Sequence, residues 1–324
     1  HLLLGRGCDY GDASVRDEET GGRSMTTEKL EHVERNIEKT PKRVPQRPLR
    51  PGTYSWNLGI IELVAILLGL LYLVPFYYVV ANSFKSMAEI FTNTSALPNE
   101  WLTSNYTEAW EAMNYGRVFL NSLFITVGAN AIIVIFTSMA AWKLVRTKHW
   151  ISTMIFFLFV AAMVIPFQSI MIPLVKVSSI LGLLNSHWGL MVMYLGFGSG
   201  ISVFLYHGFM KSIPEEIEEA AIIDGCSTWG VFWRIVFPLL KPITVTIVIL
   251  NSLWIWNDFL LPSLVLRDVE LRTIPLATFY FFGQYTKQWD LALAGLVLGI
   301  VPLLVFFFGM QKHIIKGITS GSIK

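Results

Sequence analysis

Six long runs of apolar residues constrain the fold of this chain more than any other feature. A helix needs about 20 predominantly apolar residues to cross the hydrocarbon core of a bilayer. Charged residues make up only 15% of the 324-residue chain, whereas soluble domains carry about 25%. The sequence therefore predicts an all-α integral membrane protein with six transmembrane helices. The six runs cover residues 58–80, 119–142 and 151–175, and approximately 188–210, 239–265 and 291–310.

Lys and Arg residues next to these runs predict the orientation of the chain in the membrane. Cytoplasmic loops usually carry an excess of both residue types. The polar segment before the first run, the loop at 143–148, the segment after the fourth run and the C-terminal tail all contain basic residues, and the opposite side has fewer near the membrane. We therefore expect a multi-pass protein of the cell (plasma) membrane. Both termini and the loop between the fourth and fifth spans would face the cytoplasm.

Residues 1–54 differ from the transmembrane domain that we assign to residues 55–324. This N-terminal segment is polar and contains four prolines between positions 41 and 51. Because it cannot bury much apolar surface, we expect it to be largely disordered or loosely helical on the cytoplasmic side. Met25 opens a stretch that looks like a natural beginning, so residues 1–24 are either a non-native upstream extension or a genuine unstructured one. The sequence leaves both alternatives open.

An acidic segment, EEIEEAAIIDGCSTWGVFWRIVFP at residues 215–238, interrupts the apolar runs. Ser212 and Glu215 fit a capping box, and the glutamates that follow suit the positive end of a helix dipole. Gly225 suits the left-handed position that ends a helix, and Ser227 or Thr228 can cap a second one. The pattern predicts two short helices joined by a glycine turn. A simple connector on the membrane surface is the alternative.

The second predicted helix has an apolar stripe. Trp229, Phe232, Trp233 and Val236 recur at intervals of three and four residues, which predicts a single apolar face. Pro238 is expected to close this element before the fifth span.

The spacing of the acidic segment resembles the EAA loop of binding-protein-dependent ATP-binding-cassette (ABC) importers, here at about residues 212–238. Glu219-Ala220-Ala221 precedes Gly225 by three residues, and nine residues separate Gly225 from Ile235-Val236-Phe237-Pro238. Phe237 departs from the leucine of the family pattern. VPFYYVVANSFK at 74–85 and WNDFLLP at 256–262 also resemble the maltose-type sugar permeases. The resemblance covers the chain from about residue 55 to its end.

This resemblance implies one permease subunit of an ATP-driven carbohydrate importer, with an oligosaccharide as the expected substrate. The subunit would form half of a translocation pathway that works by alternating access, and the EAA helix would dock on a cytoplasmic ATPase. The implied partners are a second homologous permease, an ATPase dimer, an extracellular solute-binding protein, the carbohydrate and membrane lipid, but no nucleic acid. The residues assigned to ATPase coupling are Glu218, Glu219, Ala220, Ala221, Asp224, Gly225, Ile235 and Pro238.

Motifs for ATP hydrolysis or other catalysis are missing from the sequence. It contains no GxxxxGK[ST] phosphate-binding loop, no HExxH and no GxSxG. We therefore expect a transport subunit and not an enzyme, with no catalytic residue, no metal and no cofactor of its own. ATP and Mg²⁺ would be bound by the separate ATPase.

Polar residues inside the apolar runs are candidates for a substrate pathway. Gln168 lies between two prolines of the third run, and Asn251, Trp254, Asn257 and Asp258 lie in the fifth. Positions 251, 254 and 258 would share one helix face, and an aromatic ring beside hydrogen-bonding groups suits a sugar. Interhelical hydrogen bonding is the alternative. The resemblance also leaves open that the sugar site lies on the partner permease.

Other classes of function remain open at this stage. An ABC permease for a non-sugar solute is one alternative. A secondary transporter driven by an ion gradient would need a site inside the membrane, for which Asp258 is the only plausible seed. A membrane-bound scaffold or enzyme is a further rival. The small-residue stretch GFGSG at 196–200 permits either close helix packing or a flexible break.

Overall fold

The computed structural model describes residues 56–283 and 287–320, with side chains from 59 to 283 and from 287 to 311. The predicted N-terminal segment, residues 1–54, lies outside the described residues. The chain divides into two compact units, 1–72 and 73–324, and helix α2 (Trp56–Asn82) runs from one into the other. In the described part of the chain every regular element is a helix, apart from an isolated bridge between Phe282 and Lys287.

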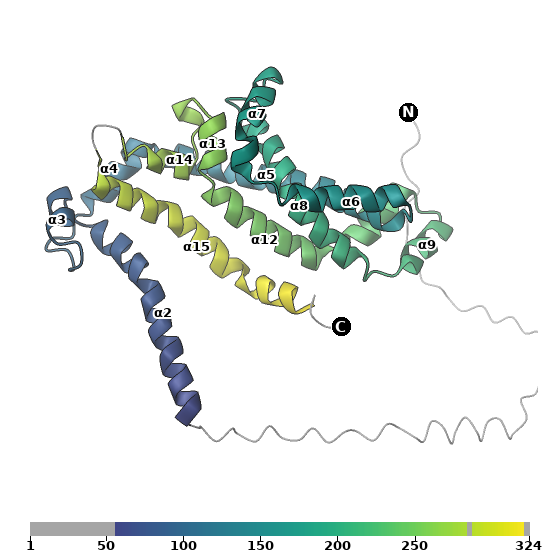
Figure 1. The fold of residues 1–324 in the computed structure, drawn as a ribbon, viewed down its shortest axis with the longest axis horizontal. Helices are drawn as coiled ribbons and strands as arrows, with labels where there is room; N and C mark the ends of the chain where they lie inside the picture. The colour runs from purple at the N-terminus through teal and green to yellow at the C-terminus, as the bar shows by residue number, and fades with distance from the viewer. Residues whose placement is uncertain (1–55, 284–286, 321–324) are drawn as a thin grey trace, which may run out of the picture. The chain divides into compact units, whose positions relative to one another are not determined.

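The second unit holds the remaining helices (Figure 1). Their bounds are α3 Met87–Thr92, α4 Ser104–Met113, α5 Tyr115–Arg146, α6 Trp150–Ala162, α7 Phe167–Ile180, α8 His187–Met210, α9 Glu215–Ile223, α10 Thr228–Val231, η1 Phe232–Val236, α11 Phe237–Leu239, α12 Lys241–Asn257, α13 Leu260–Val265, η2 Val269–Leu271, α14 Ile274–Phe279 and α15 Trp289–Ser320.

Four helices among the described residues are long and apolar enough to cross a membrane, and two bent helix pairs raise this number to six if each pair is one span. The four single helices contain Gly59–Asn82, Tyr115–Arg146, His187–Met210 and Trp289–Gln311. The prediction of an all-helical chain with helices able to span a membrane is thus confirmed for the described residues. Six complete spans remain a prediction.

The third apolar run is not the continuous helix that its hydropathy predicts. It breaks between α6 and α7, whose axes differ by 105°. Pro166 has an extended backbone, with φ −63° and ψ 133°, and it has no N–H to continue the helical ladder. The residue before a proline is also disfavoured in the helical conformation. The proline therefore ends α6 and places Gln168 in the first turn of a new helix.

The fifth apolar run begins at a bend and is interrupted near its end. The axis bends by 73° between the segment Thr228–Leu239 and α12. At its other end α12 stops at Asn257, and Asp258 is extended, with ψ 125°. The expectation that residue 258 continues the helix face of residues 251 and 254 is therefore wrong, because the helix ends one residue earlier.

Helix α8 packs closely on its neighbours through glycines. A Cβ atom at Gly198 would lie 2.8 Å from Cδ1 of Ile133 in α5, and one at Gly200 would lie 3.0 Å from the carbonyl oxygen of Phe159 in α6. Since α8 is continuous through GFGSG, this stretch serves close packing and is not a break. Helices α12 and α15 lie side by side in the same unit (Figure 1).

A fully buried lysine holds the segment between α2 and α4. Lys85 has a relative exposure of 0%. Its Nζ donates hydrogen bonds to the carbonyl oxygens of Asn93 and Ala96, both at 2.7 Å. Asn105 donates to the carbonyl oxygens of Ser83 and Lys85, each at 2.9 Å. Polar contacts to the backbone therefore help to hold this segment together.

Candidate functional sites: the coupling segment and a membrane groove

Helix α9 begins later than the capping-box pattern predicts. Its N-cap is Pro214, with an extended backbone and no side-chain cap. Ser212 instead donates from Oγ to the carbonyl oxygen of Phe209, at the end of α8. The predicted capping box is therefore wrong, because Pro214 separates Ser212 from the helix. Three glutamates still lie in the first turn, where the helix dipole favours them.

The end of α9 is the glycine turn that the sequence predicts. Gly225 has φ +86°, in the left-handed region. Its N–H donates to the carbonyl oxygen of Ile222 at 3.0 Å, and the N–H of Cys226 donates to that of Ala221 at 3.0 Å. This pair of bonds is a Schellman motif, which satisfies the last carbonyl groups of a helix.

The second helix of the segment has two faces where one apolar face was expected. Ser227 caps α10 by accepting from the N–H of Gly230 at 3.2 Å. Phe232 and Val236 are buried, but Trp229 and Trp233 are exposed. A π-helical turn, η1, occupies Phe232–Val236, and Pro238 follows inside α11. Because the proline ring clashes with the carbonyl group four residues before it, the wider turn fits here. The helix then ends at Leu239, one residue after the expected end at Pro238.

Glu218 points into the protein and contacts α5. It is 7% exposed. Its Oε1 accepts from Nε of Arg146 at 2.8 Å and pairs with Nη2 of Arg146 at 2.6 Å. Its Oε2 accepts from Nε1 of Trp142 at 2.8 Å. Arg146 also donates from Nη2 to the carbonyl oxygen of Ile213 at 3.0 Å. We call Trp142, Arg146 and Glu218 the α5–α9 clamp.

The other residues assigned to coupling mostly face outwards. Glu219, Ala220, Asp224 and Gly225 are exposed, and Ala221 is buried. The three isoleucines of α9, Ile217, Ile222 and Ile223, are also exposed, and Ile223 reaches 86% exposure. In the second helix Ile235 is half-buried and Pro238 is exposed. The end of α9 therefore presents a mixed apolar and acidic surface, while Glu218 and Ala221 hold the helix to the protein.

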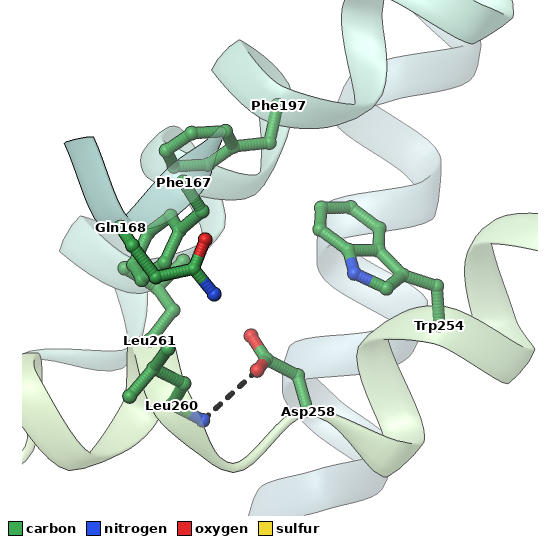
Figure 2. A pocket seen from close by; sticks show the side chains of 7 residues that line it. All are labelled: Phe167, Gln168, Phe197, Trp254, Asp258, Leu260 and Leu261. Carbon is green, nitrogen blue, oxygen red and sulfur yellow. Dashed lines mark hydrogen bonds between the residues drawn. The ribbon is translucent and has the colours of Figure 1, made fainter. Parts of the chain in front are cut away.

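A groove lies where α6 breaks from α7, against α8 and α12. One cavity there has a volume of about 220 Å³ (Figure 2). A second cavity of about 260 Å³ shares Phe197 and Trp254 with the first. The first is lined by Phe167, Gln168, Phe197, Trp254, Asp258, Leu260 and Leu261. The second adds Met163, Gly198, Ile201, Leu250 and Asn251.

The polar groups of the groove converge on its first cavity. Figure 2 shows the Gln168 amide and the Asp258 carboxylate facing each other, with the Trp254 indole at the side. Asp258 accepts from the Tyr194 hydroxyl at 2.9 Å and from the N–H of Leu260 at 3.0 Å. Tyr194 meets Trp254 edge to face, with 5.4 Å between ring centroids. These contacts fix the carboxylate and the indole in position.

Two asparagines of the predicted pathway lie elsewhere or have other contacts. Asn251 is 3% exposed and donates from Nδ2 to Oγ of Ser202 in α8 at 3.2 Å. It therefore joins α12 to α8, although it also lines the second cavity. Asn257 is exposed and donates to the carbonyl oxygen of Leu253, one turn earlier. The structure thus brings Gln168, Trp254 and Asp258 together and leaves Asn257 outside the groove.

Sequence reasoning missed several residues of both sites. Arg146 counted only as a basic residue near the membrane, and Trp142 only as the end of an apolar run. Tyr194 and Phe197 lie about 60 residues before their partners in α12, so no local spacing could reveal them. The described residues contain no group of three or more His, Cys, Asp or Glu side chains placed to hold a metal ion.

Comparison with known proteins identifies the family of this chain. Residues 111–320 match the family of the binding-protein-dependent transport system inner membrane component. The chain belongs to this family. It is thus a membrane permease of the ABC importer type, a transport subunit and not an enzyme, and the family suggested by the EAA spacing is confirmed.

Relatives in this family cover most of the chain. The probable starch degradation products transport system permease protein AmyC of Thermoanaerobacterium thermosulfurigenes is 48% identical over 82% of this chain and 96% of its own length. The melibiose/raffinose/stachyose import permease protein MelC of Bacillus subtilis (strain 168) is 34% identical over 83% and 97%. A solved bacterial ABC transporter involved in import of the acidic polysaccharide alginate contains a chain with TM-score 0.65 and 25% identity, which covers 80% of this chain and 98% of that one.

Proposed function

We propose that this permease imports an oligosaccharide and forms one half of its translocation pathway. The 48% identity to a permease named for starch degradation products, over nearly all of that protein, carries this proposal. The groove adds a chemical reason. An indole offers an apolar ring to sugar C–H groups, and an amide beside a carboxylate can bond several hydroxyl groups.

The groove suits a path through the membrane because its wall contains a helix break. Irregular backbone inside a membrane is tolerated where it is buried in protein or lines a water-filled cavity. The break between α6 and α7 lies beside Gln168, which lines the first cavity with Trp254. We infer that sugars pass along this groove while the transporter alternates between outward-open and inward-open states.

The exposed end of α9 serves as the surface that meets the ATPase. Its apolar Ile222 and Ile223 stand beside the acidic Glu219 and Asp224, which suits a contact that is both apolar and polar. In this proposal α9 and both termini face the cytoplasm, and the chain crosses the membrane six times.

The complete transporter contains further chains. The partners are a homologous permease, an ATPase dimer that binds ATP and Mg²⁺, and an extracellular solute-binding protein. The family description, which names binding-protein dependence, supports the last of these.

Uptake by the reconstituted transporter tests this function. The genes for the permease, its neighbouring permease, the ATPase and the binding protein are expressed together, and proteoliposomes receive radiolabelled maltotriose or raffinose. We expect ATP-dependent uptake of at least one sugar. Trp254→Ala should lower uptake more than it lowers ATP hydrolysis, and Asn257→Ala, outside the groove, serves as the control. Uptake that follows an ion gradient without ATP would refute the proposal in favour of a secondary transporter.

A further inference from the structure

We propose that the two adjacent glutamates of the EAA segment have different tasks. Glu219 faces outwards, to the ATPase, whereas Glu218 is a positioning residue that fastens α9 to α5. This inference rests on the proposed function, because it assumes that α9 receives the movement of the ATPase. It assigns a transmission role to the α5–α9 clamp, which nothing in the EAA spacing indicates.

The geometry of the clamp directs the Glu218 carboxylate towards α5. Both carboxylate oxygens are bonded from the α5 side, by the guanidinium group of Arg146 and the indole of Trp142. The Arg146 side chain is 15% exposed and the Glu218 side chain 9%. Charge-assisted bonds to a planar guanidinium fix direction as well as distance. Glu219, one residue later, has no such contact among the described residues and is exposed.

Arg146 ties a second point of the coupling segment to α5. Its Nη2 also donates to the carbonyl oxygen of Ile213, which lies in the short connection between α8 and α9. Lys148 adds an exposed ion pair with Glu215 at 3.1 Å, which contributes little in water. The beginning of α9 and the end of α8 are therefore held to α5 by one arginine.

Helix α5 continues from this clamp to the opposite end of the transmembrane unit. Asn130, in its middle, donates to Oγ of Ser252 in α12 at 3.1 Å. Near its start Asn121 donates to the carbonyl oxygens of Glu270 and Arg272, at 2.7 and 3.0 Å. A displacement of α9 would thus reach α12, which carries Trp254 of the groove, and the loop beyond α13.

A buried ion pair is weak evidence for stability, because well-packed apolar side chains often serve as well. A role in fixing the orientation of one element relative to another is better attested for such pairs than a role in stability. The clamp fits the first of these roles, since it sets the direction of α9 relative to α5 at two separate points. We therefore expect its loss to affect the coupling of ATP hydrolysis to transport more than it affects assembly.

Three matched variants separate the two glutamates. Glu218→Gln removes the charge of the clamp, Glu219→Gln removes the outward charge, and Glu216→Gln alters an exposed glutamate of the same helix turn as a control. Each variant is studied in the complete transporter. The measurements are membrane abundance, ATPase retained per permease during purification, and maltotriose or raffinose taken up per ATP hydrolysed.

We expect Glu218→Gln to keep its ATPase but to transport roughly tenfold less sugar per ATP, the size of effect that the loss of one charge-assisted bond produces. Glu219→Gln should retain less ATPase, and Glu216→Gln should match wild type. The proposal is overturned if Glu218→Gln transports like Glu216→Gln, or if it loses the ATPase as Glu219→Gln does.

Two further tests keep the outcome decisive. If Glu218→Gln does not reach the membrane, Trp142→Phe and Arg146→Lys each weaken the clamp more gently, and wild-type coupling in both would overturn the proposal. If the wild-type complex hydrolyses ATP but imports neither sugar, the proposed substrate class fails. In that case, hydrogen exchange of backbone amides tests the role of the clamp. Faster exchange of the amides of residues 215–223 in Glu218→Gln alone supports it, and equal exchange in all three variants refutes it.

Discussion

Gly225 forms the turn that ends α9, and replacing it tests how strongly this turn positions the coupling surface. Its φ of +86° lies where side chains with a Cβ atom are strained. No heavy atom lies within 4 Å of a Cβ built at this position, so the cost comes from the backbone alone. That cost is about 1–2 kcal/mol for Gly225→Ala, and it should be larger for the β-branched Gly225→Val.

A turn that relaxes to avoid this strain would displace the exposed end of α9. If docking on the ATPase must restore the original turn, the affinity falls by about 5- to 30-fold, since about 1.4 kcal/mol corresponds to a factor of ten. The assay titrates purified ATPase against the permease in detergent. We expect the loss to rise from Gly225→Asn through Gly225→Ala to Gly225→Val, because asparagine tolerates left-handed backbone better than most residues.

Gly196→Ala is the matched control for this series. Gly196 is also exposed and has no atom within 4 Å of a built Cβ, but it lies inside α8. Helical backbone accepts alanine, so ATPase binding should not change. If Gly225→Val binds the ATPase as tightly as Gly196→Ala does, the turn does not position the docking surface.

Three further predictions concern stability. Arg146→Ala leaves Glu218 buried without its partner and should lower the stability by about 3–5 kcal/mol, whereas the double change Arg146→Met with Glu218→Met should recover most of it; thermal unfolding in detergent measures both. Lys85→Met removes the donor from the carbonyl groups of Asn93 and Ala96, at a cost of about 1–3 kcal/mol, and limited proteolysis should then cut between α2 and α4. Gly200→Ala places a Cβ 3.0 Å from a backbone oxygen of α6 and should cost about 1–3 kcal/mol, which a lower midpoint of thermal unfolding would reveal.

The apolar runs predicted the helical class and the approximate places of the long helices, because hydropathy reports whether a segment can enter lipid. They did not predict the two helix breaks. The third run remains apolar through Met163–Pro166, so its composition is that of a continuous span. The break lies at one proline, and hydropathy does not measure its effect on the backbone.

The coupling segment was predictable in its local geometry but not in its contacts. The Gly225 turn follows from backbone sterics and from a glycine at the right place. The inward direction of Glu218 depends on Trp142 and Arg146, which are more than 70 residues away in sequence. A run of glutamates looks like a solvated surface until the fold shows which member is buried.

The sequence predicted several of the residues that line the groove, but not how the backbone brings them together. Trp254 and Asp258 do line one cavity, yet they do not lie on one continuous helix, because α12 ends between them. The carboxylate lines the cavity from the connection between α12 and α13, where it accepts from the N–H of Leu260. Asn257 was a candidate for the same reason, as a polar residue in an apolar run. Its side chain bonds the backbone of its own helix, and it does not line this cavity.

The π-helical turn at Phe232–Val236 sets how many residues the second coupling helix can gain or lose without changing direction. A π turn holds more residues than the 3.6 of an α-helical turn, so it takes up one residue more than an ordinary turn needs. Deleting one residue from this stretch should therefore restore the ordinary ladder and leave the flanking turns in nearly their present directions. A further inserted residue has no such turn to occupy and would rotate everything before it by about 100° about the helix axis. The exposed indole of Trp229 and the surface at the end of α9 would then turn away from their present directions, so the stretch should tolerate the loss of one residue better than the gain of one.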